Sequence, residues 1–215
     1  MIKTQKLNTL FDKWEHHVTE YKGKFVRDGI INEPLFDKAK KKVLFIGKEP
    51  NNPNGTFGDF REEWNEGVSY TFARRIAEWS FGILNDFPLF NDVEKTGVLE
   101  SCLTQIAFMN IKKSAGRGSA DITTIMKHAK MNCEFINQQI DIIAPDIIIT
   151  GTSVPQLRDC VFPNMEFKDC GYYIWIGKYR NMKIIDFYHP SSRNAPSAAY
   201  CLLKNVIQSE AYRNL

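Results

Sequence analysis

Apolar residues in this chain follow two different periods, and the two alternate along the sequence. Four segments space their apolar side chains as one stripe of a helix does: 6–22, 69–84, 131–143 and 197–213. Four further segments read as strands or a hairpin: 43–47, 103–111, 146–150 and 171–187. The runs VLFIG and DIIIT are almost wholly apolar, which is typical of strands covered on both faces of a parallel sheet.

Strands that alternate with helices predict an α/β fold. We expect a three-layer αβα architecture, with a central, mainly parallel four-stranded sheet. No repeat, low-complexity tract or linker divides the chain, so we expect a single domain over 1–215, with 1–40 as an N-terminal helical extension. The segment 51–68 reads as a long polar loop with three glycines, and loops of that length are often functional.

Composition narrows the class of protein. The chain is 43% hydrophobic and 25% charged, as is usual for a soluble globular protein. No apolar run approaches the roughly 20 residues that cross a bilayer, and the first residues lack the apolar segment of a signal peptide. We therefore expect a cytoplasmic protein with no membrane partner. The five cysteines form no CxxC pair, which argues against a zinc or iron–sulfur site and predicts free thiols.

Charge permits nucleic-acid binding without requiring it. The formal net charge is +3 and the sequence pI is about 8.5, whereas dedicated binders often exceed a pI of about 9. The lysine-rich run at 38–42 is typical of a solvated face. Lys112, Lys113 and Arg117 follow the second strand and are candidates for contacts with phosphates.

Each predicted parallel strand ends in a distinctive polar sequence: GKEPN, FMNIKK, GTS or YHPSS. Because ligands bind beyond the carboxyl ends of such strands, we expect these sequences to line one cleft. Glu49 offers a carboxylate beside a proline that stiffens its loop. Asn110 offers an amide that can donate and accept, as reading the edge of a base requires. His189 offers an imidazole that can donate to a developing negative charge.

The turn after the last strand adds groups suited to a phosphate. Ser191 and Ser192 provide hydroxyls and backbone N–H groups, and Arg193 follows at the tip. Carboxylate, amide and imidazole around one cleft suit cleavage of a bond whose leaving group departs as an anion. Taken singly, such residues are more often turn formers or hydrogen-bonded structural groups.

In this order, GKEP, FMN and HPSS resemble motifs of the uracil-DNA glycosylase superfamily, over about residues 43–210. The resemblance implies the fold of that superfamily. It also implies an enzyme that needs neither a metal nor a cofactor and that flips uracil or another deaminated base out of DNA. The enzyme would hydrolyse the N-glycosidic bond and release the free nucleobase. The branch with a basic stretch after the asparagine carries a four-cysteine iron–sulfur cluster, for which this chain has no cysteine pattern. We expect a monomer.

The resemblance also implies roles for three strand-end residues. Glu49 falls where many members keep the Asp or Asn that positions the attacking water. Asn110 matches the asparagine that reads uracil, and His189 matches the histidine that stabilises the departing anion. Glutamate adds one methylene at its position, and a misplaced water can cost about 100-fold in rate.

Residues that would contact DNA follow from the same resemblance. Ser191, with Ser192, belongs to the loop that pinches the DNA backbone, and Arg193 lies where some members place a wedge in the vacated stack. Tyr70 is expected to stack on the flipped base, with Phe57 as the alternative. The continuation SRNAPS departs from the family's usual proline–leucine sequence.

Two other functions stay open. A nucleic-acid or nucleobase-binding module without turnover would explain Glu49 and the altered turn. A hydrolase or transferase acting on a small nucleotide would explain the modest net charge. The steepness of salt dependence in DNA binding separates these possibilities, because phosphate contacts release counterions.

Overall fold

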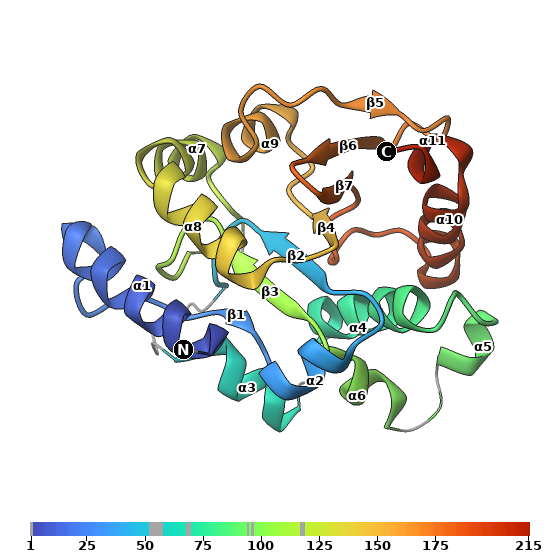
Figure 1. Cartoon of the computed structure of the whole chain (residues 1–215), viewed down its shortest axis with the longest axis horizontal. Coiled ribbons are helices and arrows are strands. Elements are labelled where there is room, and N and C mark those ends of the chain that lie inside the picture. The colour runs from blue at the N-terminus through green and yellow to red at the C-terminus, as the bar shows by residue number, and fades with distance from the viewer. Residues whose placement is uncertain (1, 52–57, 68–69, 94, 96, 117–118) are drawn as a thin grey trace.

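A seven-stranded mixed sheet runs through the centre of the computed structural model (Figure 1). The structure describes residues 2–51, 58–67, 70–93, 95, 97–116 and 119–215. The strands are β1 (Gly29–Ile30), β2 (Val43–Gly47), β3 (Ala107–Asn110), β4 (Ile147–Thr150), β5 (Lys168–Asp169), β6 (Trp175–Tyr179) and β7 (Met182–Asp186). Across the sheet they follow the order β1, β3, β2, β4, β7, β6, β5.

The centre of the sheet is parallel and its edges are antiparallel. β3, β2, β4 and β7 pair in parallel, and every residue of β2, β3 and β4 is buried. The α/β prediction is confirmed, but the prediction of a four-stranded sheet is wrong. β1 pairs antiparallel with β3, while β6 and β5 extend the other edge. Because β1 and β5 contain two residues each, they carry no periodic apolar pattern.

Helices lie on both sides of the sheet (Figure 1). They are α1 (Lys3–His17), α2 (Glu33–Lys38), α3 (Phe60–Glu66), α4 (Thr71–Leu84), α5 (Phe90–Val93), α6 (Val98–Leu103), α7 (Ile122–Met131), α8 (Cys133–Ile143), α9 (Pro155–Val161), α10 (Pro196–Gln208) and α11 (Glu210–Arg213). A short 3-10 turn at Thr19–Tyr21 follows α1. None of the helices in the described segments is long and apolar enough to cross a membrane.

Each face of the sheet has its own hydrophobic core. Side chains alternate between faces along a strand, so Phe45 and Ile149 enter one core, while Leu44 and Ile148 enter the other. The first core packs against α3, α4, α6 and α10, and the second against α1, α2, α7, α8 and α9. Each fully buried side chain of this size contributes about 1.5–3 kcal/mol. The two cores hold the central strands in register.

The N-terminal helix is part of the second core. Leu7 and Trp14 of α1 are fully buried, and Trp14 Nε1 donates to Asn132 Oδ1 (3.0 Å). Asn132 also donates to the backbone oxygen of His128 (2.9 Å), and α7 ends and α8 begins at this residue. The expected helix over 131–143 is therefore α8 alone, preceded by α7.

A helix also lies within the segment expected to be a long loop. α3 occupies residues 60–66, and the Asp59 side chain accepts from the backbone N–H of Arg61 (2.9 Å) at its start. Such an N-cap satisfies one of the free donors of a helix terminus. Trp64 of α3 is buried and stacks on Phe108 of β3, with ring centroids 4.8 Å apart. The apolar side chains of α3 thus cover β3 on the side of the first core.

Candidate functional site

The carboxyl ends of β2, β3, β4 and β7 meet at one edge of the sheet, as predicted. Gly47 pairs in register with Asn110, and β7 ends three residues before His189. Two glycines permit close approach here. A Cβ on Gly47 would lie 2.8 Å from Asn110 Oδ1, and one on Gly151 would lie 3.1 Å from Pro190 Cδ. The strand-end sequences therefore form one contiguous site.

His189 is held at this edge as a neutral ring with a defined tautomer. Its Nδ1 accepts a hydrogen bond from the backbone N–H of Ser191 (3.1 Å), so the proton of the neutral ring is on Nε2. Burial, together with the positive charge of Lys48, lowers the pKa of His189 from 6.5 to about 4. The Phe72 ring packs against it, with centroids 5.5 Å apart. This imidazole can donate from Nε2 to an oxygen that gains negative charge.

The pKa of His189 predicts a pH dependence of stability. Between pH 6.5 and about 4 the unfolded imidazole binds a proton that the folded one does not, so the free energy of unfolding falls as pH falls through this window. We expect His189→Gln to lose less stability than wild type between pH 7 and 4 in urea unfolding. His16→Gln, at an exposed histidine of α1, is the control and should follow wild type. Equal losses in His189→Gln and wild type would contradict the assigned pKa.

Asn110 is buried and has an unsatisfied amide. Its backbone N–H donates to Asp28 Oδ2 (2.8 Å), which holds the end of β3 in place. The residue is 2% exposed, and Nδ2 has no hydrogen-bond partner among the described residues. Leaving such a donor unpaired costs about 1–3 kcal/mol, so a ligand carbonyl that reached Nδ2 would recover this energy.

A cavity of about 10 Å³, with room for about one water, adjoins these groups and lies against α4. Its lining includes Gly47, Phe72, Phe108, Gly151 and Pro190. Phe72 contacts Phe108, with ring centroids 5.6 Å apart, and also His189, so it joins the wall of this cavity to the imidazole. The sequence pattern predicts Phe72 only as part of the apolar stripe of its helix, but its position in the first turn of α4 puts it at the site.

Glu49 forms an ion pair within the protein. Its Oε2 accepts from Lys112 Nζ (2.7 Å), and the two side chains are 9% and 11% exposed. Lys112 Nζ also donates to the backbone oxygens of Ser114 (3.1 Å) and Ala115 (3.2 Å). Gly116 packs directly on the carboxylate, since a Cβ there would lie 1.9 Å from Glu49 Cδ. The ion pair engages Oε2 of Glu49, and Lys112 is not free for a phosphate.

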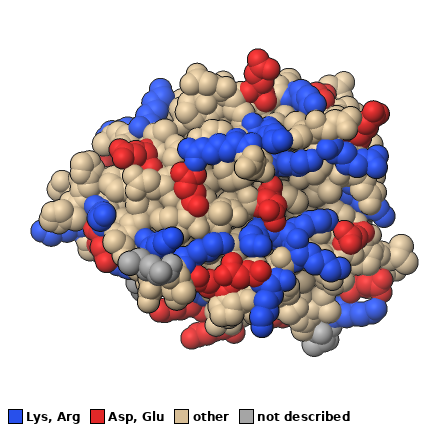
Figure 2. Space-filling model, viewed as in Figure 1, with Lys and Arg blue, Asp and Glu red and all other residues tan. Residues whose placement is uncertain are grey.

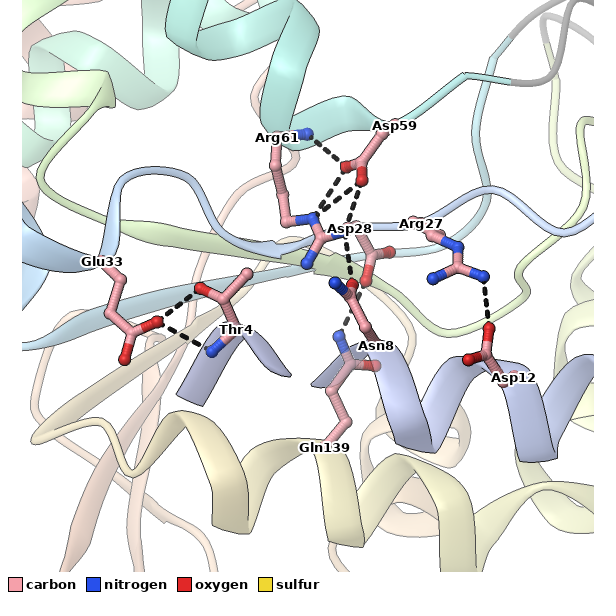
Figure 3. Close-up of polar contacts among 9 residues, drawn as sticks. All are labelled: Thr4, Asn8, Asp12, Arg27, Asp28, Glu33, Asp59, Arg61 and Gln139. Atoms are coloured by element: carbon pink, nitrogen blue, oxygen red, sulfur yellow. Dashed lines mark hydrogen bonds and ion pairs between the residues drawn. The ribbon is translucent and has the colours of Figure 1, made fainter. Parts of the chain in front are cut away.

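The prediction that Lys113 contacts DNA is wrong. It is completely buried, and its Nζ pairs with Asp28 Oδ1 (2.6 Å) and Oδ2 (2.8 Å). Gln139 donates to the same carboxylate of Asp28 (2.7 Å). Figure 3 shows Asp28 and Gln139 beside the pair formed by Arg61 and Asp59. A lysine without solvent exposure cannot contact DNA. Its ammonium group instead lies over the Phe11 and Trp14 rings of the second core, where Asp28 supplies its counter-charge.

The aromatic residues predicted to meet the base fall in two places. Tyr70 is 40% exposed just before α4, and its hydroxyl accepts from Trp64 Nε1 (2.6 Å). No ring contact joins Tyr70 to His189 within the part of the chain that the structure describes, whereas Phe72 makes one. Phe57 and Arg117 lie outside the described residues.

The turn after His189 is open to solvent. Ser191 and Arg193 are exposed and Ser192 is half-buried, with the Ser192 N–H donating to the His189 backbone oxygen (2.8 Å). Asn194 Nδ2 donates to Ser192 Oγ (3.2 Å). Figure 2 shows rows of basic side chains with acidic ones between them on the face seen in Figure 1, which agrees with the mild net charge.

Comparisons with protein-family models and with curated proteins find no match for this chain.

Proposed function

We propose that this chain is a DNA glycosylase-like hydrolase that cleaves the N-glycosidic bond of uracil or another deaminated base by base flipping. The observation that carries the proposal is the neutral His189, whose Nε2–H has no hydrogen-bond partner among the described residues and lies at the edge where Asn110 also lies. Support also comes from the order of GKEP, FMN and HPSS, which follow β2, β3 and β7, three of the four parallel strands. No metal ligand set is needed for this chemistry.

The proposed reaction uses the site residues as follows. The C1′–N bond breaks, and its electron pair leaves with the base, which becomes an anion. The His189 Nε2–H donates a hydrogen bond to an oxygen of that anion, and Asn110 Nδ2 donates to a base carbonyl. Water adds to C1′ and releases a proton, so the products are an abasic sugar and the free base. The positive charge of Lys48 favours the anion electrostatically.

Base excision from oligonucleotides tests this proposal. Single- and double-stranded substrates would carry one uracil, hypoxanthine or xanthine, and cleavage at the abasic site would be measured after heating in base. We expect release of at least one of these bases by wild type. No cleavage of any substrate by protein shown to be folded would contradict the proposal.

Asn110→Asp tests the reading of the base edge. The carboxylate keeps the shape of the amide but removes the Nδ2 donor, so we expect uracil excision to fall about 10–100-fold, in line with 1.4–2.7 kcal/mol for one hydrogen bond to a charged group. Relative excision of the three bases should change, while circular dichroism stays that of wild type. An unchanged base preference would remove Asn110 from the site.

A specific observation favours a second candidate, a nucleobase- or nucleic-acid-binding protein without turnover. The Glu49 carboxylate is paired with Lys112 and packed against Gly116, so its negative charge is offset before any substrate binds. Glu49→Gln separates the two: in a hydrolase that uses this carboxylate, turnover falls strongly. Saturable binding of uracil-containing oligonucleotides without product would favour the second candidate.

A further inference from the structure

Lys48 is a half-buried lysine at the carboxyl edge of the sheet, and the proposed reaction uses it only for its charge. It follows β2 directly, and its backbone oxygen accepts from the N–H of Lys112 (2.9 Å). This bond continues the pairing of β2 with β3 beyond the strand ends. The backbone of Lys48 is therefore held by the sheet, and its side chain extends from a fixed point.

The side chain of Lys48 crosses from β2 to the loop after β4. Its Nζ donates to the backbone oxygen of Thr152 (3.4 Å), the residue after Gly151. A Cβ on Gly151 would lie 3.1 Å from Pro190 Cδ and 3.8 Å from His189 Cα. Because β4 lies between β2 and β7 in the sheet (Figure 1), this contact carries the Lys48 ammonium towards the His189 turn. The Lys48 charge accordingly contributes to the low pKa of His189.

Three lysines follow the ends of β2 and β3, and their amines have different contacts. Lys112 Nζ has three acceptors, which are Glu49 Oε2 and two backbone oxygens. Lys113 is completely buried and pairs with Asp28. Lys48 Nζ has one acceptor at a distance longer than is usual for a hydrogen bond, and no carboxylate partner among the described residues. Of these three amines, that of Lys48 is the least engaged.

This environment suits a lysine that acts as a nucleophile. Only the neutral amine attacks a carbonyl carbon, and burial favours the neutral form of a lysine. Burial lowers the pKa of Lys48, whereas the charge of Glu49 raises it. Since Glu49 already pairs with Lys112, it does not hold the Lys48 ammonium in a salt bridge.

We infer that Lys48 forms a Schiff base with the abasic sugar left by base release, so that the site also cleaves the DNA strand at this sugar. The inference rests on the proposed function, because the abasic sugar is the product of base excision at the same edge of the sheet. In its ring-opened form this sugar has an aldehyde at C1′, and aldehydes are substrates for lysine nucleophiles.

The inferred reaction balances without an oxidant or a reductant. The lone pair of Lys48 Nζ adds to C1′, and the aldehyde oxygen leaves as water with uptake of one proton, which gives an iminium. His189 Nε2–H donates a hydrogen bond to that oxygen while it gains negative charge. The iminium then loses a C2′ proton to water, the C3′–O bond breaks, and the 3′ phosphate leaves with the electron pair. Hydrolysis of the remaining Schiff base releases the sugar fragment and restores the amine.

Trapping with borohydride tests the inference on a substrate that needs no excision. The protein is mixed with borohydride and an oligonucleotide that carries one preformed abasic site. Hydride adds to C1′ of the iminium and leaves the strand covalently attached to the protein. We expect wild type to form this cross-link, and mass spectrometry of the digest should place it on Lys48. Without borohydride, wild type should cut the strand at the abasic site at neutral pH, without heating in base.

Lys48→Arg separates a nucleophile from a charge. Arginine keeps the positive charge but stays protonated in proteins, so it cannot form the iminium. We expect this variant to lose both the cross-link and the strand cleavage, while its circular dichroism stays that of wild type. Lys168→Arg, at an exposed lysine of β5, is the matched control and should cross-link as wild type.

The outcomes separate this inference from the proposed function. Release of uracil by wild type without any cross-link would overturn the inference and leave the proposed function standing. A cross-link that Lys48→Arg retains, or that maps to another lysine, would also overturn it. A cross-link at Lys48 without release of any base would support Lys48 as the nucleophile and reject the hydrolase.

Discussion

Replacing His189 by alanine is expected to lower base excision by about 10²–10³-fold, the cost of removing one preorganised donor to a developing anion. The reason is geometric: Ser191 N–H holds Nδ1 as the acceptor, so the ring proton is on Nε2, which has no partner in the part of the chain that the structure describes. Single-turnover excision from a uracil-containing single strand measures the chemical step. Oligonucleotide affinity should stay within about threefold of wild type, because the lost donor acts on charge that develops only as the bond breaks.

His16→Ala is the matched control, since His16 is exposed on α1 and far along the chain from the site. It should excise as wild type. His189→Gln is informative because glutamine keeps an N–H donor, and partial activity would identify donation rather than charge as the role. Excision by His189→Ala at more than a tenth of the wild-type rate would exclude His189 from the proposed chemistry.

Asp28→Ala is expected to destabilise the protein by about 3–5 kcal/mol, the range for breaking a buried ion pair. The carboxylate of Asp28 is fully buried and accepts from Lys113, Gln139 and the backbone N–H of Asn110. Without it the Lys113 ammonium has no counter-charge, and burial already lowers the pKa of Lys113. Urea unfolding at pH 7 gives the free energy of unfolding directly.

Two further variants make the Asp28 result interpretable. Asp12→Ala removes a carboxylate from an exposed pair with Arg27 and should cost no more than about 1 kcal/mol. In Asp28→Ala with Lys113→Met, both charges are gone, and stability should recover in part. A loss in Asp28→Ala no larger than in Asp12→Ala would contradict the buried pair.

Asp28 and its hydrogen bonds also connect the stability of the protein to the candidate site. Asn110 N–H donates to Asp28, so loss of the carboxylate frees the end of β3, where the base edge would be read. A positional error of about 1 Å at a catalytic group can cost about 100-fold in rate. If an Asp28 variant is folded and excises a base, its excision rate should therefore fall by more than its loss of folded protein explains.

The sequence by itself determined the class of fold and the edge at which polar groups gather. Runs such as VLFIG and DIIIT are apolar at every position or nearly so, and they specify buried parallel strands locally. Parallel strands share a carboxyl edge by geometry, so the strand pattern alone is enough to place Asn110 and His189 at the same edge. The strand number could not be predicted, because two-residue strands such as Gly29–Ile30 exist only through their partner.

Only the tertiary structure decided which charged groups are available. Lys113 and Asp28 are 85 residues apart in the chain, and Glu49 and Lys112 are 63 apart. A lysine read from sequence carries a solvated charge by default. It can be buried only when a partner from elsewhere in the fold compensates its desolvation, and no local pattern encodes that partner. For the same reason, the helical stripe shows Phe72 only as a core residue, and the fold alone sets its ring against His189.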